Sequence, residues 1–291
     1  MNRTIKPPQG GFFVSILKNI QFQSLLNRVI QMNSENISFS ANRRNNMSNE
    51  NMAALKAALM QNVKMKTVTL SDGKKVTVRP MLVKEIKIIT DAKENDKDPS
   101  EFATEIIKNC IEEKINLDSV TIFDFERLMF EIWKLTRKSP IIGIPFVCKN
   151  EIDGKECGTD IVVDSNLNTV RLSREPETLI KLNNNVSVKM RYPNQTETEF
   201  FDLTNEADFF DLCWRLVEEV HFNGQVMKVG IDIPLEELLE LTEYVSAEEM
   251  TPMFEFVNNM PRLVMDVAVK CSCCGHHEAV RLNGISEICF G

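Results

Sequence analysis

Two short segments of this chain share one plan, in which an extended apolar run is followed by a cysteine, a second cysteine and a glycine. The first segment has Cys148 and then Cys157-Gly158, and the second has Cys271 and then Cys274-Gly275. A cysteine pair joined by a tight turn aims two thiolates at one point, and the trailing glycine permits the positive φ that the turn needs. Each segment is therefore typical of a metal-binding knuckle.

Two knuckles together provide four sulfur ligands, the number that a structural zinc ion takes. The second knuckle is the more specific signal, because two residues separate its cysteines and strand-like segments flank it. Eight residues separate the cysteines of the first, but this insert is polar and contains the turn-forming pair Asp153-Gly154, so we expect an enlarged loop. The predicted zinc ligands are Cys148, Cys157, Cys271 and Cys274.

Other assignments of these residues remain open. Cys273 lies inside the second pair and His276 lies just after it, so either could replace a ligand, and all of the thiols could stay without metal. Cys271 and Cys273 would form an awkward chelate, and a hydrated surface position suits His276 and His277. The three remaining cysteines, which lie in apolar segments, are predicted to be small core residues: Cys110, Cys213 and Cys289.

Composition narrows the classes of protein that this chain can belong to. A chain of 291 residues can bury one large core or two modest ones, and no apolar run is long enough to cross a bilayer. Cysteines spaced as metal pairs indicate a reducing compartment, which favours the cytoplasm. The net charge is −8, although residues 1–46 hold six Lys or Arg and one Glu. We expect 1–46 to be a flexible extension, or upstream translation before a second start at Met47.

The pattern of apolar residues predicts an α+β fold. We expect a helix over 47–63, a hairpin over 66–81 and helices over 83–93, 99–114, 122–138, 203–221, 235–244 and 247–259. Strands are expected at 141–147, 160–164, 170–172, 178–182, 186–192, 226–233, 263–270 and 278–282.

The order of these elements predicts the domain organisation. After the extension 1–46, a hairpin and helical region covers 47–140. A zinc-ribbon-like β region covers 141–291, with an α/β insertion at 165–262 between its two knuckles. The helix over 122–138 has too many apolar residues for one narrow stripe, so it is expected either in the core or against a partner, with core burial favoured.

Several segments resemble the baseplate proteins of T4-like bacteriophages, the family of hub components and hub-assembly catalysts. The resemblance covers 64–291. It rests on the run Met65–Glu85, on Phe123-Asp-Phe-Glu126, Val188–Pro193 and Asn259-Met-Pro-Arg262, and on Cys271-x-x-Cys274-Gly275 followed by Leu282-x-Gly284-Ile285. The enlarged first knuckle and the ending Glu287-Ile-Cys-Phe-Gly291 depart from the family pattern.

This resemblance implies a non-enzymatic protein that builds the central hub of a contractile-tail baseplate, as a hub subunit or as an assembly factor that acts as a chaperone. The implied partners are other hub or tail proteins, with no small-molecule substrate. The implied locations are the host cytoplasm during assembly and the tail baseplate of the virion.

Two other functions compete with this reading. An enzyme is disfavoured because four thiolates leave zinc no open position for substrate, and the sequence has no phosphate-binding glycine loop or nucleophile elbow. A zinc-ribbon module that binds nucleic acid is the stronger competitor. Yet, taken over the two knuckles together, acidic residues outnumber basic ones, whereas phosphate contacts require a basic surface. The acidic segment 236–249 is either a solvated face or a docking surface for a basic partner.

Overall fold

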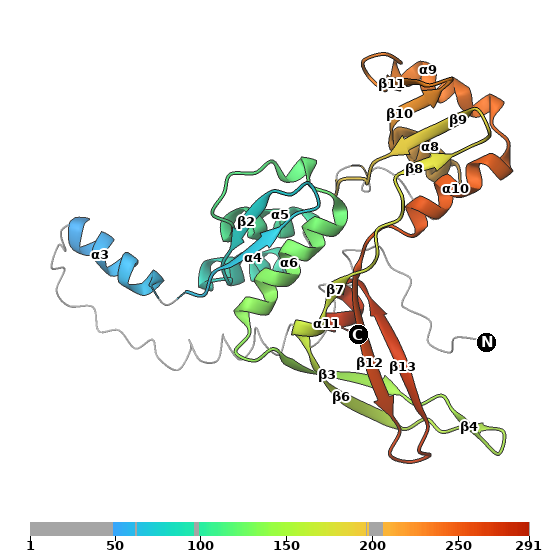
Figure 1. The fold of residues 1–291 in the computed structure, drawn as a ribbon. Helices are drawn as coiled ribbons and strands as arrows, with labels where there is room; N and C mark the ends of the chain where they lie inside the picture. The colour runs from blue at the N-terminus through green and yellow to red at the C-terminus, as the bar shows by residue number, and fades with distance from the viewer. Residues whose placement is uncertain (1–48, 62, 96–98, 196, 198–205, 291) are drawn as a thin grey trace. The chain divides into compact units, whose positions relative to one another are not determined.

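The computed structural model describes residues 49–61, 63–95, 99–195, 197 and 206–290. The predicted extension 1–46 and the start at Met47 lie outside these residues. The chain divides into two compact units (Figure 1). The first unit contains the described residues up to Lys114, Arg127–Arg171 and those from Val264 onward, and the second contains Ile115–Glu126 and Leu172–Leu263. The domain limits expected from the sequence stay a prediction.

The structure confirms a mixed α+β fold. In the described part of the chain, no helix combines the length and the apolar character needed to cross a bilayer. The N-terminal part of the first unit holds a hairpin and helices, as predicted, with the turn Asp72-Gly73 made possible by a φ of +83° at Gly73. Its elements are α3 (Asn49–Met60), β1 (Lys66–Thr69), β2 (Lys75–Val78), α4 (Val83–Glu94), α5 (Pro99–Cys110) and most of α6 (Ile122–Thr136).

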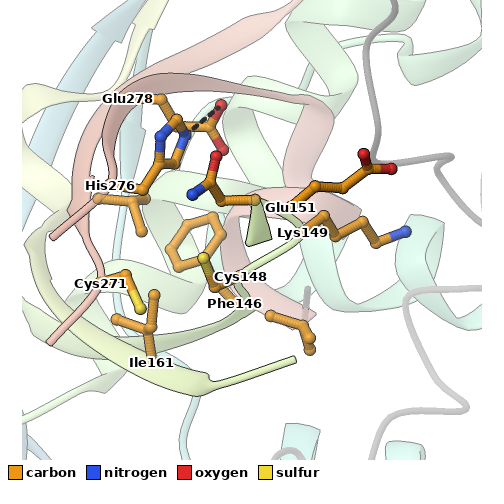
Figure 2. Close-up of a pocket in the computed structure, with 11 residues that line it drawn as sticks. Phe146, Cys148, Lys149, Glu151, Ile161, Cys271, His276 and Glu278 are labelled. Atoms are coloured by element: carbon orange, nitrogen blue, oxygen red, sulfur yellow. Dashed lines mark ion pairs between the residues drawn. The ribbon is translucent and has the colours of Figure 1, made fainter. Parts of the chain in front are cut away.

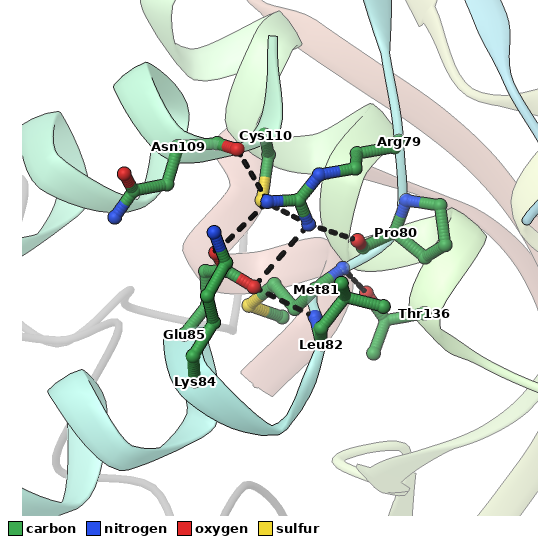
Figure 3. A network of polar contacts seen from close by, with 9 residues as sticks. All are labelled: Arg79, Pro80, Met81, Leu82, Lys84, Glu85, Asn109, Cys110 and Thr136. Atoms are coloured by element: carbon green, nitrogen blue, oxygen red, sulfur yellow. Dashed lines mark hydrogen bonds and ion pairs between the residues drawn. The ribbon is translucent and has the colours of Figure 1, made fainter. Parts of the chain in front are cut away.

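A buried ion pair fixes the start of α4 against the end of α5. The Arg79 guanidinium donates to both carboxylate oxygens of Glu85, at 3.2 and 2.9 Å, and to the backbone carbonyl of Asn109 (Figure 3). Glu85 also accepts the N–H of Leu82 at 2.8 Å, which satisfies a free backbone donor at the start of the helix. Because both charges are hydrogen-bonded, their burial is tolerated.

Helix α6 is buried along most of its length, which confirms the expected core position. It begins in the second unit and continues in the first. Its fully buried apolar side chains are those of Phe123, Phe125, Leu128, Phe130 and Ile132.

Two antiparallel ribbons form the rest of the first unit. The first ribbon pairs β3 (Ile141–Val147) with β6 (Asp160–Asn166), and the second pairs β12 (Leu263–Lys270) with β13 (His277–Asn283). Strand β7 (Arg171–Leu172) adds to β12, so that the second sheet has the order β13-β12-β7. The remaining elements are β4 (Glu151–Ile152), β5 (Lys155–Glu156), the short turn η2 (Leu167–Thr169) and α11 (Gly284–Phe290).

The second unit is a four-stranded sheet with helices. The strand order is β11-β10-β9-β8 and the paired strands are antiparallel. Its core contains Val188, Trp214, Met253 and Phe256. The strands are β8 (Leu179–Lys181), β9 (Val186–Met190), β10 (Val217–Phe222) and β11 (Gln225–Lys228), and the helical elements are η1 (Leu117–Ser119), α8 (Glu206–Arg215), α9 (Leu235–Glu240), η3 (Leu241–Tyr244) and α10 (Ala247–Asn258).

The helix predicted over 203–221 is wrong in its second half. Residues 203–205 lie outside the described part, α8 ends at Arg215, and the residues from Val217 form β10. The cause is the turn Asn223-Gly224, where both residues have positive φ, +50° and +76°. Such a turn joins two strands into a tight hairpin, so the preceding β-branched residues pair with β9 and β11 rather than extend the helix.

Candidate metal centre

The first knuckle is built on the end of the β3–β6 ribbon. The Cys148 N–H donates to the carbonyl of Thr159 at 2.9 Å, and the Gly158 N–H donates to the carbonyl of Cys148 at 2.9 Å. The Cys157 N–H donates to the carbonyl of Asn150 at 2.8 Å. Gly158 has a φ of +64°, which explains why glycine follows the second cysteine. The eight-residue insert forms the small hairpin β4–β5.

The second knuckle repeats this construction between β12 and β13. The Cys271 N–H donates to the carbonyl of His276 at 2.8 Å, and the Gly275 N–H donates to the carbonyl of Cys271 at 3.1 Å. Gly275 has a φ of +72°, so it takes the same part as Gly158 in the first knuckle. The backbone therefore turns back within four residues and presents both sulfur atoms on one side.

The two knuckles meet at the ends of the two ribbons (Figure 1). The Sγ atoms of the four predicted cysteines all lie within 4.8 Å of one another. Two of these separations are shorter, 3.6 Å between Cys148 and Cys274 and 3.8 Å between Cys157 and Cys271. The structure thus brings together the four cysteines that the sequence singled out, and this cluster could hold a metal ion.

The alternative ligands lie elsewhere. Cys273 is exposed and is not part of the cluster, although it sits between two of its members. The Nε2 atom of His276 lies 3.8 Å from the Glu278 carboxylate, on an exposed side chain. The three other cysteines are buried, as predicted for core residues: Cys110, Cys213 and Cys289.

The protonation of the four clustered thiols indicates a site that needs a cation. Backbone N–H groups of the knuckle, chiefly that of Cys274, lower the pKa of Cys271 to about 6, and a hydrogen bond with Thr159 lowers the pKa of Cys157. The Asn150 N–H favours the thiolate of Cys148 too, but loss of water and the neighbouring thiols outweigh it and raise the Cys148 pKa to about 12. Four thiolates this close repel one another, so a cation is needed before all are deprotonated.

Two polar side chains support the cluster, and the sequence analysis did not identify them. The Asn150 Nδ2 atom lies 3.7 Å from the sulfur of Cys274, and the Thr159 hydroxyl lies 3.1 Å from that of Cys157. Such contacts orient ligands and tune their basicity. Both residues lie two positions from a cysteine of the first knuckle, and that spacing is the signal that could have found them.

A cavity of about 230 Å³ opens beside the cluster. Cys148 and Cys271 are among the residues that line it, together with the apolar side chains of Phe146 and Ile161 (Figure 2). Lys149, Glu151, His276 and Glu278 are also in its wall. The cavity therefore has both apolar and charged lining residues and adjoins two of the four sulfur positions.

The comparison with protein families gave a match to the family described as T4 bacteriophage base plate protein, over residues 60–289. Comparisons with curated proteins and with solved structures gave no match. The family match covers both knuckles and both compact units. The chain therefore belongs to the family of T4 bacteriophage base plate proteins.

Proposed function

We propose that this chain is a non-enzymatic structural or assembly protein of a phage baseplate, and that a structural zinc ion held by Cys148, Cys157, Cys271 and Cys274 stabilises it. The observation that carries the zinc proposal is the spacing of the sulfur atoms. Zinc–sulfur bonds of about 2.3 Å in a tetrahedron place the sulfur atoms about 3.8 Å apart. The separations of 3.6 and 3.8 Å, and the 4.8 Å limit on all six pairs, agree with this ligand set.

Zinc in such a site would have a structural role. Four thiolates complete a tetrahedral shell, so no coordination position is left for a substrate or for an activated water molecule. The ion would join the end of the β3–β6 ribbon to the end of the β12–β13 ribbon, in the manner of a zinc ribbon. The segment between the knuckles would then be an insertion whose two ends the ion holds together.

The family match supports a place in the baseplate, and we further propose the hub as that place. The chain would act either as a hub subunit or as a factor that prepares hub components in the host cytoplasm. Its partners would be other hub or tail proteins. The zinc-ribbon alternative, binding of nucleic acid, gains no support from the surroundings of the cluster, where Glu151, Asp153, Glu156 and Asp160 are exposed.

Quantitative mass spectrometry of purified virions and of infected cells tests this role. A hub subunit is expected in virions at a fixed ratio to other baseplate proteins. An assembly factor is expected in infected cells in complex with hub proteins, and absent from virions. Recovery with neither virions nor hub proteins, or salt-dependent DNA binding at physiological ionic strength, would contradict the proposal.

A further inference from the structure

Strand β6 has one edge that no strand of the described chain covers. Its sheet has only two strands, β3 and β6. Opposed residues in an antiparallel ladder alternate between pairs that hydrogen-bond to each other and pairs whose backbone groups point outward. The Cys148 N–H donates to the carbonyl of the opposed residue Thr159 at 2.9 Å, so this pair is of the hydrogen-bonded class. Because the two classes alternate along an antiparallel ladder, the pair Pro145 and Val162 belongs to the other class, and the backbone groups of Val162 point away from β3.

The residues two positions before and after Val162 on β6 belong to the same class of pair. The backbone groups of Asp160 and Asp164 also point to the open edge of β6. The outer edge of β3 is less suited to pairing with a further strand, because Pro145 has no N–H to donate to it. In addition, helix α11 contacts β3. The ribbon therefore offers a hydrogen-bonding edge mainly along β6.

The side chains along this edge alternate between acid and apolar. Asp160, Val162 and Asp164 are all exposed, and Val162 as a residue is 70% exposed. Gly143 lies across from Asp164, and a Cβ at Gly143 would come within 2.9 Å of the Val162 side chain. The absence of a side chain at Gly143 thus leaves room for Val162 on the outer face of the ribbon.

This pattern disfavours pairing with a second copy of the same strand. An antiparallel pair centred on Val162 would place Asp160 of one copy directly opposite Asp164 of the other, twice. Like charges at opposed positions destabilise strand pairing. A strand with basic residues at those two positions would instead gain two favourable cross-strand pairs.

We propose that β6 is a docking edge for an extended segment of another protein, with a basic residue, an apolar residue and a basic residue at alternate positions. The segment adds to the sheet antiparallel to β6, so that its basic side chains lie opposite Asp160 and Asp164 and its central apolar side chain lies opposite Val162. Main-chain hydrogen bonds supply affinity, and the alternate side chains supply specificity.

Fluorescence anisotropy with synthetic peptides tests this inference on the full chain. The probe is a labelled nonapeptide with the core Lys-Val-Val-Val-Lys, and it is compared with a Glu-Val-Val-Val-Glu core and with a backbone N-methylated copy of the lysine peptide. Only the unmethylated lysine peptide is expected to bind. All proteins are compared at equal metal content, so that the result does not depend on the zinc proposal.

Variants of β6 separate edge pairing from simple charge attraction. Val162→Pro removes an N–H that β3 does not use, so the ribbon is expected to fold while binding is lost, and Val162→Thr is expected to bind as wild type. Asp160→Lys/Asp164→Lys is expected to lower affinity on the order of tenfold. The matched control Glu236→Lys/Glu240→Lys changes the net charge equally on α9 and is expected to leave binding unchanged.

Three results would overturn the inference. One is the absence of saturable binding by the lysine peptide. Another is equal binding by wild type and by Val162→Pro when circular dichroism shows both to be folded. The third is sedimentation of the wild type as a dimer that Val162→Pro dissociates, because a second copy would then occupy the edge.

Discussion

The sulfur atoms of Cys148 and Cys274 lie 3.6 Å apart, although 126 positions separate the two residues in the sequence. Bringing such distant segments together on folding costs conformational entropy, because the unfolded chain rarely holds them close. A covalent cross-link between such segments reduces that cost. A metal ion bound by the four cysteines in the folded chain would offset part of this cost.

Loss of one ligand is expected to destabilise the first unit strongly. A structural zinc ion contributes on the order of 10 kcal/mol to the folding of small domains. We therefore expect Cys157→Ser and Cys274→Ser to lower the melting temperature of the first unit, measured by Trp133 fluorescence in a Trp214→Phe background. Cys273→Ser is the matched control and is expected to melt as wild type. Equal melting of all three variants would contradict the account.

Removal of the charge on Glu85 is expected to destabilise the same unit by another route. Glu85→Gln leaves the Arg79 guanidinium buried without an anionic partner, and breaking a buried ion pair costs about 3–5 kcal/mol. Urea unfolding at pH 7, followed by Trp133 fluorescence, measures this loss. Glu236→Gln, on an exposed side chain, is the control and is expected to have no effect.

The effect of Glu85 is expected to depend on pH in one direction. Burial alone would raise the pKa of Glu85, but hydrogen bonds from Arg79 and from the Leu82 N–H hold it below its usual value. The stabilisation is therefore complete above the pKa of the unfolded chain, about 4.3, and is lost as the pH falls through the folded value. The gap between wild type and Glu85→Gln should narrow below pH 4, and a gap constant from pH 7 to pH 3 would count against this interpretation.

The capping box at Ser246 is expected to stabilise the second unit. The Ser246 hydroxyl accepts the Glu249 N–H at 3.3 Å, and the Glu249 carboxylate accepts the Ser246 N–H at 2.9 Å. Ser246→Ala should cost about 1 kcal/mol, whereas Ser246→Asp keeps a capping acceptor and should cost less. Trp214 fluorescence in a Trp133→Phe background measures both. An alanine variant as stable as the aspartate variant would show that the cap is dispensable.

Close contact between Gly143 and Val162 predicts a coupled pair of substitutions. Gly143→Ala places a Cβ 2.9 Å from the Val162 side chain, so atoms at this contact must shift. A side chain turned about 30° off its rotamer costs about 1 kcal/mol. Val162→Ala in the same background removes the clash. A double-mutant cycle should show a favourable coupling energy, and simple additivity of the two substitutions would mean that the contact has no energetic role.

Much of the fold could be predicted because local signals agreed with tertiary pairing. Strands β3 and β12 were expected at their observed limits, since an apolar run precedes each knuckle, and the turn Asp72-Gly73 identified the first hairpin. The same reasoning identified the four clustered cysteines, because a glycine with positive φ marks the second cysteine of each pair.

The features that were missed depend on contacts between distant segments or on a turn that was overlooked. The helical pattern around Trp214 continued into residues that form β10, and only the turn Asn223-Gly224 indicated the change. The pairing of Arg79 with Glu85 was also missed, since exposed and buried charges look alike in a sequence. The contact of Asn150 with the sulfur of Cys274 was missed as well, although Asn150 lies two positions after Cys148 and that spacing was the signal for it.

Metal analysis of the purified full chain tests the central claim most directly. Inductively coupled plasma mass spectrometry is expected to find about one zinc ion per chain, carried through size-exclusion chromatography and lost in Cys157→Ser and Cys274→Ser but kept in Cys273→Ser. A folded wild-type protein that contains no metal, and that still unfolds at the same temperature after dialysis against a chelator, would contradict the claim.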